Sequence, residues 1–170
     1  MAADSSGFAV EPLGGRHDRS SFACGVEALD LYFRERAGQD MRRRLASCFV
    51  LVNERQPQEV LGYYTLAATG IDLDALPEEV ARKLPRYPRI PATLLGRLAI
   101  ASNHRGRGLG ELLLFDAFAR SLASDIASFA FVVDPIDEAA RRFYERYRFL
   151  PLSSGERRHF LAMSEIAQLF

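Results

Sequence analysis

The chain has 170 residues, of which 48% are apolar and 26% are charged. This length and composition match one globular domain, so we expect residues 1–170 to form a single domain. The 22 basic and 22 acidic residues cancel, which excludes the global charge that marks many nucleic-acid-binding and membrane-surface proteins, so any site for a polyanion must be local.

The number of cysteines and the N-terminal sequence bear on the cellular compartment of the protein. Two cysteines, Cys24 and Cys48, are too few for a disulfide framework or a zinc site, which is typical of a reducing environment. The first 20 residues lack a basic region followed by an apolar one, and no run of 18 apolar residues occurs later. We therefore expect a cytoplasmic protein without a membrane partner.

The first predicted elements are a basic helix and a hairpin. Apolar residues between about Gly25 and Leu45 recur at spacings of three and four, which predicts an amphipathic helix. Its outer face carries Arg34, Arg36 and the run Arg42-Arg43-Arg44, a pattern typical of either a solvated face or an anion-binding one. Residues 47–52 and 59–69 are rich in β-branched and aromatic residues and flank the polar stretch NERQPQ, which predicts two antiparallel strands.

The second half alternates strands and helices. Residues 71–84 predict a short helix with Asp72 or Asp74 as N-cap and Pro77 in its first turn, after which Pro85, Pro88 and Pro91 should interrupt regular structure. The remaining predicted elements are a central strand over 93–100, a helix over 108–122, a strand over 129–133, a helix over 137–147 and a strand over 159–163. This order predicts an α/β domain with a mixed sheet flanked by helices.

The strongest local signal lies between the central strand and the helix that follows it. The strand LLGRLAI leads into Arg105-Gly106-Arg107-Gly108-Leu109-Gly110. Glycines let the backbone approach an anion, and the first amides of the helix lack intrahelical partners and face outward with the positive end of the helix dipole. The loop lacks the Gly-Lys-Ser/Thr of a nucleotide P-loop and the Gly-x-Gly-x-x-Gly of a dinucleotide fold. It therefore predicts a diphosphate site of another kind.

Two motifs carry a resemblance to a known family. Arg105-x-x-Gly108-x-Gly110 resembles the Arg/Gln-x-x-Gly-x-Gly/Ala signature of the GNAT N-acetyltransferases, and residues 137–144 resemble the Asn-x-x-Ala-x-x-x-Tyr helix of that family, with Asp137 replacing Asn. The resemblance implies the GNAT acyl-CoA N-acyltransferase fold and acetyl-CoA as co-substrate. It implies contacts to acetyl-CoA from Leu98, Ala99, Ile100, Arg105, Gly106, Arg107, Gly108, Leu109, Gly110, Asp137 and Ala140.

The same resemblance implies the catalytic chemistry. Tyr144 matches the family tyrosine beside the coenzyme sulfur, so we expect it to protonate the departing thiolate. The strand TLLGRLAI offers no acidic residue as general base, which leaves water as the base or an acceptor amine that is already largely neutral. His104 and His159 are conceivable bases, although a satisfied histidine is the more common case. Arg148 departs from the family pattern, which usually has glycine at this helix end.

Other chemistries lack support in the sequence. Cys24 and Cys48 are better interpreted as small packed residues than as acyl carriers. No constellation supports Ser/His/Asp hydrolysis or metal chemistry, so we expect no metal site.

Further segments are similar to one group within the family. These segments are residues 24–30, 62–66, 95–100 and 143–144, and they resemble the GNAT toxins of bacterial toxin–antitoxin modules, the TacT and AtaT group. This closer resemblance implies acetylation of the α-amine of aminoacyl-tRNA, inhibition of translation, and a ribbon-helix-helix antitoxin as partner. A homodimer is the expected assembly.

The chemistry of the acceptor is compatible with this interpretation. An α-amine has an ordinary pKa near 8, well below the roughly 10.4 of lysine, so a protein base is dispensable. Phosphate contacts to tRNA are expected from a set of basic residues, Arg42, Arg43, Arg44, Arg82, Lys83, Arg86, Arg89 and Arg97. Arg97 lies on the central strand and could equally form a buried ion pair. The alternatives are a GNAT enzyme for a small-molecule or protein amine and a noncatalytic GNAT-like module.

Overall fold

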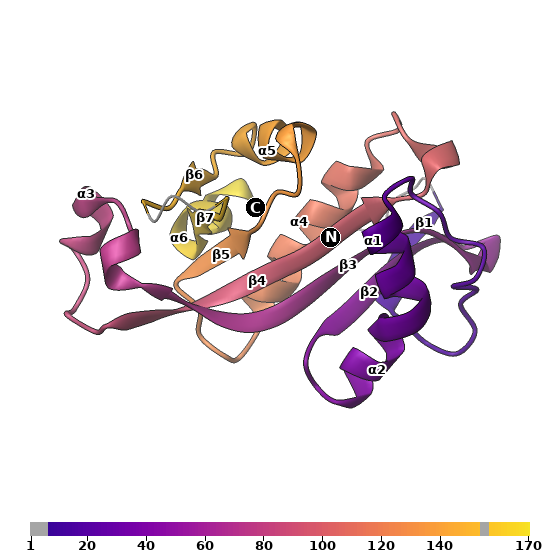
Figure 1. The fold of residues 1–170 in the computed structure, drawn as a ribbon, viewed down its shortest axis with the longest axis horizontal. Helices are drawn as coiled ribbons and strands as arrows, with labels where there is room; N and C mark the ends of the chain where they lie inside the picture. Colours follow the sequence, from indigo (N-terminus) through magenta and orange to yellow (C-terminus); the bar gives the residue numbers. More distant parts are fainter. Residues whose placement is uncertain (1–6, 154–156) are drawn as a thin grey trace. The chain divides into compact units, whose positions relative to one another are not determined.

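The computed structural model describes residues 7–153 and 157–170. The chain divides into two compact units, Met1–Ala67 with Gly96–Arg120 and Ala68–Leu95 with Ser121–Phe170. Seven strands form one mixed sheet in the order β1-β2-β3-β4-β5-β7-β6 (Figure 1), which confirms the predicted fold class. Strands β3 and β4 contribute residues to both units.

The first unit contains an antiparallel sheet. Strands β1 (Phe8–Pro12), β2 (Ser47–Asn53) and β3 (Gln56–Asp72) pair in sequence order. The hairpin of β2 and β3 was predicted and is confirmed, with a turn shorter than NERQPQ. Strand β1 was not predicted, because five residues of mixed polarity carry no clear alternation.

The predicted basic helix is a continuous helical segment with a change of pitch. It consists of α1 (Glu27–Leu31), a π-helical turn (Tyr32–Arg36) and α2 (Ala37–Arg42). At its end, the N–H of Arg44 donates to the carbonyl of Met41 at 3.1 Å and the N–H of Leu45 donates to that of Asp40 at 2.8 Å. This is a Schellman cap, and its left-handed position is held by Arg44, with φ of 59°.

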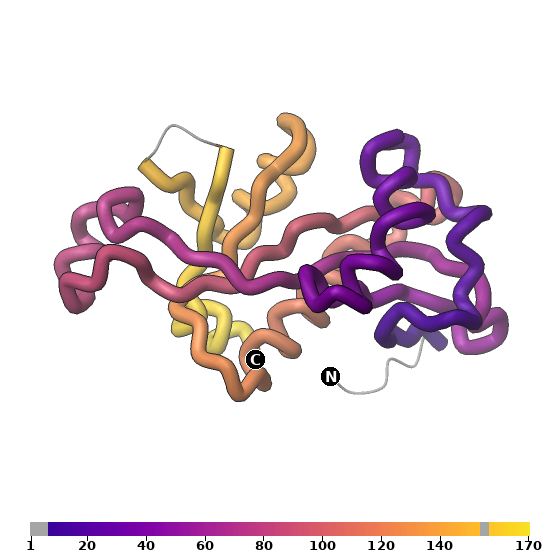
Figure 2. Tube along the Cα trace, turned by 60° about the horizontal axis from the view of Figure 1, so that its bottom comes forward, coloured from indigo at the N-terminus to yellow at the C-terminus, as the bar shows by residue number. Residues whose placement is uncertain are grey.

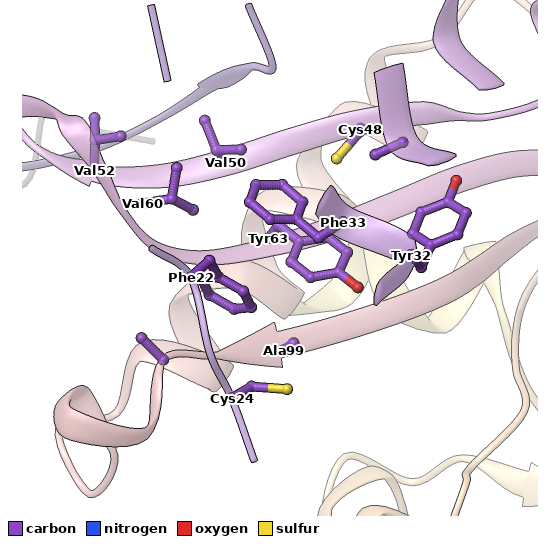
Figure 3. Close-up of a cluster of buried hydrophobic side chains, with 12 residues drawn as sticks. Phe22, Cys24, Tyr32, Phe33, Cys48, Val50, Val52, Val60, Tyr63 and Ala99 are labelled. Atoms are coloured by element: carbon purple, nitrogen blue, oxygen red, sulfur yellow. The ribbon is translucent and has the colours of Figure 1, made fainter. Parts of the chain in front are cut away.

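An aromatic cluster packs this helical segment onto the sheet. Phe33 stacks on Tyr63 of β3 with ring centroids 4.4 Å apart, and Phe22 packs edge-on against both rings (Figure 3). The hydroxyl of Tyr63 donates to the carbonyl of Leu29 at 2.7 Å. Cys48 lies in the same buried cluster. The helical segment is therefore held by apolar burial together with a satisfied polar group.

Helix α4 (Leu109–Ala123) closes the first unit. The carboxylate of Asp116 accepts the hydroxyl of Tyr64 at 2.6 Å and Nε of Arg120 at 2.8 Å. Arg120 also donates to the carbonyl of Val10 at 3.1 Å. This network links α4 to β1 and β3 and explains why Asp116 and Arg120 are tolerated on a largely apolar helix.

In the second unit, the end of β3 is followed by a short 3₁₀ turn, Leu73–Ala75, and by α3 (Glu78–Ala81). The predicted capping is wrong in detail, because Asp72 makes no cap hydrogen bond and instead pairs with Arg89 at 2.9 Å, while Pro77 precedes α3 as its N-cap. Strand β4 (Arg89–Ile100) includes Pro91, which was expected to interrupt structure. Its pairing with β5 begins one residue later, at Ala92, so that ladder does not need the missing N–H of proline.

Strand β5 (Ala130–Val133) runs parallel to β4, with Ala92 opposite Ala130 and Leu95 opposite Val133. On its other side it pairs antiparallel with β7 (His159–Ala162), which pairs with the two-residue β6 (Leu150–Pro151). Helix α5 (Glu138–Glu145) was predicted, whereas β6 and the short α6 (Met163–Ile166) were not. Figure 2 traces the chain through these segments. Within the described residues, every helix is too short or too polar to cross a membrane.

Candidate active site

The glycine-rich loop joins the end of β4 to the start of α4. One 3₁₀ turn, Ser102–His104, precedes Gly106 and Gly108, whose φ angles are +75° and +74°. A Cβ atom at either glycine would meet nothing within 4 Å, so the left-handed backbone, and not crowding, requires glycine. The first hydrogen bond of the helix runs from Leu112 N–H to the Gly108 carbonyl at 3.2 Å. The amides before it belong to the helix start and have no intrahelical partner, an arrangement that suits an anion.

A chain of three polar side chains supports this loop. A guanidinium nitrogen of Arg107 lies 2.9 Å from Nδ1 of His104, and Nε2 of the same imidazole lies 3.6 Å from the carboxylate of Glu59. Because a guanidinium can only donate, Nδ1 must accept and the imidazole proton resides on Nε2, facing Glu59. The guanidinium of Arg107 also lies 5.4 Å from the ring centroid of Phe8. The side chain of Arg107, which belongs to the loop, is therefore held by His104 and Phe8.

Arg105, the first residue of the motif, points to another segment. Its guanidinium donates to the carbonyl of Cys24, whose N–H donates to the buried carboxylate of Asp30 at 2.8 Å. Gly25 has φ of +92°, and a Cβ atom there would lie 3.1 Å from Nη2 of Arg105. Arg105 thus connects the loop to the segment that precedes α1. The motif alone does not indicate this structural role.

The end of β4 carries the residues expected to bind pantetheine, Leu98, Ala99 and Ile100. Gly62 of β3 lies against them, because a Cβ atom there would stand 2.7 Å from Cδ1 of Ile100 and 2.9 Å from the carbonyl oxygen of Ala99. The following residue, Ala101, donates its N–H to the carbonyl of Leu61 at 2.8 Å. Glycine at position 62 therefore allows β3 to approach this backbone closely.

The second motif lies in the second unit and forms α5. The carboxylate of Asp137 accepts the N–H of Ala140 at 2.8 Å, so Asp137 caps the helix as the usual Asn would. Tyr144 is buried and lies edge-on between Phe143 and Phe149, with centroid distances of 5.2 and 5.4 Å. Burial raises the pKa of Tyr144 well above its ordinary value, which keeps the hydroxyl protonated and able to donate.

Residues 25–149 match the model of the acetyltransferase (GNAT) family. The chain belongs to this family. It is an acetyl-CoA-dependent N-acetyltransferase, with acetyl-CoA as its co-substrate.

Two curated relatives are similar over most of the acetyltransferase. A protein of Sinorhizobium fredii named "Probable toxin TacT" is 30% identical over 94% of this chain and 93% of its own length. A Mycobacterium tuberculosis protein named "tRNA-acetylating toxin" is 34% identical over 85% of this chain and 86% of its own length.

Solved structures of the toxin AtaT also match. AtaT complexed with acetyl-methionyl-tRNAfMet is 32% identical, with a TM-score of 0.85 over 96% of this chain and 99% of that chain. An AtaT mutant toxin bound to the C-terminus of the antitoxin AtaR and acetyl-CoA is 28% identical, with a TM-score of 0.78 over 96% and 98%. The resemblance to the toxin group is thereby confirmed.

The histidines of the acetyltransferase share one arrangement. In His17, His104 and His159, Nδ1 forms a hydrogen bond with a backbone or arginine partner and Nε2 faces a glutamate. His159 is also buried, with Nδ1 2.6 Å from the carbonyl of Arg157. With both ring nitrogens engaged, His104 and His159 are poorly placed to serve as general bases.

The cysteines are buried free thiols. Burial, together with the hydrogen bond to Asp30, raises the pKa of Cys24 to about 11, and burial raises that of Cys48 to about 12. At neutral pH both remain protonated and weakly nucleophilic, as expected for packed residues and not for acyl carriers.

The basic residues expected to contact tRNA fall into two sets. Arg42, Arg43 and Arg44 lie exposed at the end of α2 in the first unit, and Arg82, Lys83 and Arg86 lie exposed after α3 in the second. Two others have partners: Arg89 pairs with Asp72, and the guanidinium of Arg97 lies 3.5 Å from the ring centroid of Tyr32. No described carboxylate lies within 4.0 Å of Arg97, so the buried ion pair considered for it is replaced by a cation–π contact.

Sequence reasoning missed several residues around the loop. Phe8 lies near the guanidinium of Arg107, and Glu59 contacts Arg107 through His104. Asp30 accepts the N–H of Cys24, to which Arg105 is bonded. The contacts of Phe8 and Glu59 join segments far apart in the sequence, for which a single sequence offers no signal.

Proposed function

We propose that this chain is the toxin of a toxin–antitoxin module, an acetyltransferase that transfers the acetyl group of acetyl-CoA to the α-amine of aminoacyl-tRNA and so inhibits translation. The observation that carries the proposal is its 34% identity to the tRNA-acetylating toxin over 85% of the chain. The anion-binding loop and the exposed arginines supply the chemistry that such a reaction needs.

In the proposed mechanism, the amides after Gly108 and the guanidinium of Arg107 bind the coenzyme diphosphate. The backbone of Leu98, Ala99 and Ile100 orients the pantetheine arm. The amine nitrogen attacks the thioester carbonyl, so that a C–N bond forms, the C–S bond breaks and its electron pair passes to sulfur. Tyr144 donates its proton to that sulfur, and water takes the proton from the amine.

The proposed acceptor does not need a base from the protein. With an ordinary pKa near 8, an α-amine is partly neutral at physiological pH, whereas a lysine side chain is almost fully protonated. The engaged histidines leave water as the proton acceptor.

The proposal extends to assembly and location. We infer a single functional domain over residues 1–170, a homodimer in the cytoplasm, and neutralisation by an antitoxin of the ribbon-helix-helix type. The AtaT complex with the C-terminus of AtaR supports the presence of an antitoxin partner.

The test uses purified protein, labelled acetyl-CoA and a panel of aminoacyl-tRNAs. We expect label on at least one aminoacyl-tRNA, and we expect Tyr144→Phe to lower turnover by about 10²- to 10⁴-fold while preserving acetyl-CoA affinity. Growth should arrest when the wild-type protein is expressed and continue with Tyr144→Phe. If no charged tRNA is labelled while a protein or small amine is, the toxin function is refuted and the alternative acceptor class holds.

A further inference from the structure

Two arginines from separate segments converge above a glycine of α2. A Cβ atom built on Gly38 would lie 3.0 Å from Nη1 of Arg19 and 3.4 Å from Nη1 of Arg42, so both guanidinium groups reach the same point in space. A hollow of about 340 Å³ lies here, lined by Arg19, Arg42, Met41 and three glycines, together with Leu13. The absence of a side chain at position 38 leaves this space open.

Neither guanidinium is neutralised within the part of the chain that the structure describes, where no carboxylate lies within 4.0 Å of Arg19 or Arg42. The neighbouring carboxylates are engaged elsewhere: Asp18 accepts the hydroxyls of Ser20 and Ser21 at 2.6 Å each, and Asp40 accepts the hydroxyl of Tyr32 at 2.8 Å. The two positive charges, which lie within 3.0 Å and 3.4 Å of the same built Cβ position, repel each other. An anion bound between them would be attracted to both.

The backbone at the end of α2 provides a second, independent observation. Arg44 occupies the left-handed position of the Schellman cap, with φ of 59°, where glycine is preferred. Among the described residues only Arg44 and Arg148 adopt such a φ without being glycine. Arg44 therefore brings a third guanidinium group to this helix end at a position where glycine would be less strained.

We propose that the Arg19–Arg42 pair binds one phosphate group of the backbone of the acceptor RNA, with Arg43 and Arg44 extending the basic surface along the strand. The inference rests on the proposed function and adds a phosphate subsite to it. Planar guanidinium groups suit the tetrahedral oxygens of a phosphodiester, and the hollow is open enough to admit one. Because the net charge of the chain is zero, electrostatic attraction for RNA must come from local basic sites of this kind.

The experiment measures the affinity for deacylated tRNA as a function of salt, by fluorescence anisotropy, for the wild type and four variants. Arg19→Gln and Arg42→Gln should each weaken binding about tenfold, since hydrogen bonds to charged groups are lost. The double variant should lower the slope of log affinity against log salt by about 1, because both side chains serve one phosphate. Arg55→Gln, in the turn between β2 and β3, removes the same charge and should leave both quantities near their wild-type values.

Gly38→Leu tests the geometry without changing charge. Leucine is a good helix former, and its side chain would occupy the point where the two guanidinium groups meet. We expect it to weaken tRNA binding while acetyl-CoA affinity, measured by calorimetry, stays unchanged. If Gly38→Leu fails to fold, the glutamine variants still decide the matter, because they replace exposed or half-buried side chains.

Several results would overturn the inference. A wild-type slope in the double variant, from a protein that still acetylates tRNA, would refute the phosphate subsite and leave the proposed function intact. A slope lowered by about 2 would mean two separate contacts and refute the shared phosphate. If the double variant bound RNA as tightly as the wild type but bound polyglutamate more weakly, the Arg19–Arg42 pair would be a site for an acidic peptide and not for RNA. Failure of the wild type to bind or acetylate any tRNA would refute both proposals.

Discussion

Replacing Arg44 with glycine tests whether the arginine at the end of α2 lowers the free energy of unfolding while it adds a positive charge. A non-glycine residue in the left-handed region costs about 1–2 kcal/mol, whereas glycine loses about 0.5–1 kcal/mol more than other residues through its greater freedom in the unfolded chain. Since φ of Arg44 is 59°, Arg44→Gly should raise the free energy of unfolding by about 0.5–1 kcal/mol, or Tm by about 2 °C in a protein of this size.

The neighbouring residue provides a matched control. Arg43 has φ of −84° in the right-handed region, so Arg43→Gly should lower the free energy of unfolding by about 0.5–1 kcal/mol. Both variants lose one positive charge at nearly the same place, so both should weaken tRNA binding and its salt dependence. Urea unfolding gives the first quantity and anisotropy the second.

Opposite signs in stability combined with similar losses in RNA affinity are the expected result. If Arg44→Gly were as destabilising as Arg43→Gly, the side chain of Arg44 would make a stabilising contact larger than the backbone strain, and the reasoning from φ would be wrong. If Arg44→Gly were more stable and bound RNA as tightly as the wild type, the strain would have no function in RNA binding.

Two further predictions concern the loop and the thiols. Gly108→Glu should abolish measurable acetyl-CoA binding in calorimetry, whereas Gly108→Ala, which introduces the same backbone strain without charge, should weaken it less; equal effects of the two would argue against an anion at this position. Cys24 and Cys48 should resist a thiol reagent at pH 8 in the folded protein and react fully in urea, and rapid reaction of either in the folded protein would contradict its burial. Because the pKa values are raised to about 11 and 12 in the folded state, these thiols stabilise the fold fully below their ordinary pKa near 9, and we expect that stabilisation to be lost as pH rises through 11–12.

Local signals in the sequence were sufficient for the longer elements and for the position of the loop. The periodicity of residues 25–45 and the β-branched and aromatic residues of the hairpin depend on interactions within a few residues, and both predictions were confirmed. Gly106 and Gly108 adopt the left-handed backbone of a tight loop, whereas the diphosphate site expected there stays a prediction. Asp137 is a similar case, since a cap needs only the amide three residues away. The short elements β1, β6 and α6 were missed because they are stabilised by pairing and packing and not by their own propensity.

Long-range contacts were decided by the tertiary structure. Arg105 matches the family signature, yet its guanidinium bonds to a carbonyl 81 residues away. The convergence of Arg19 with Arg42, and the relay from Glu59 through His104 to Arg107, join segments that only folding brings together. The two motifs determined the family to which this chain belongs, because each is a short run of residues that can be recognised without the fold. The side chains that surround the motif residues come from distant segments of the chain. Their identity depends on how the strands and helices pack, so it follows from the folded structure and not from a local pattern.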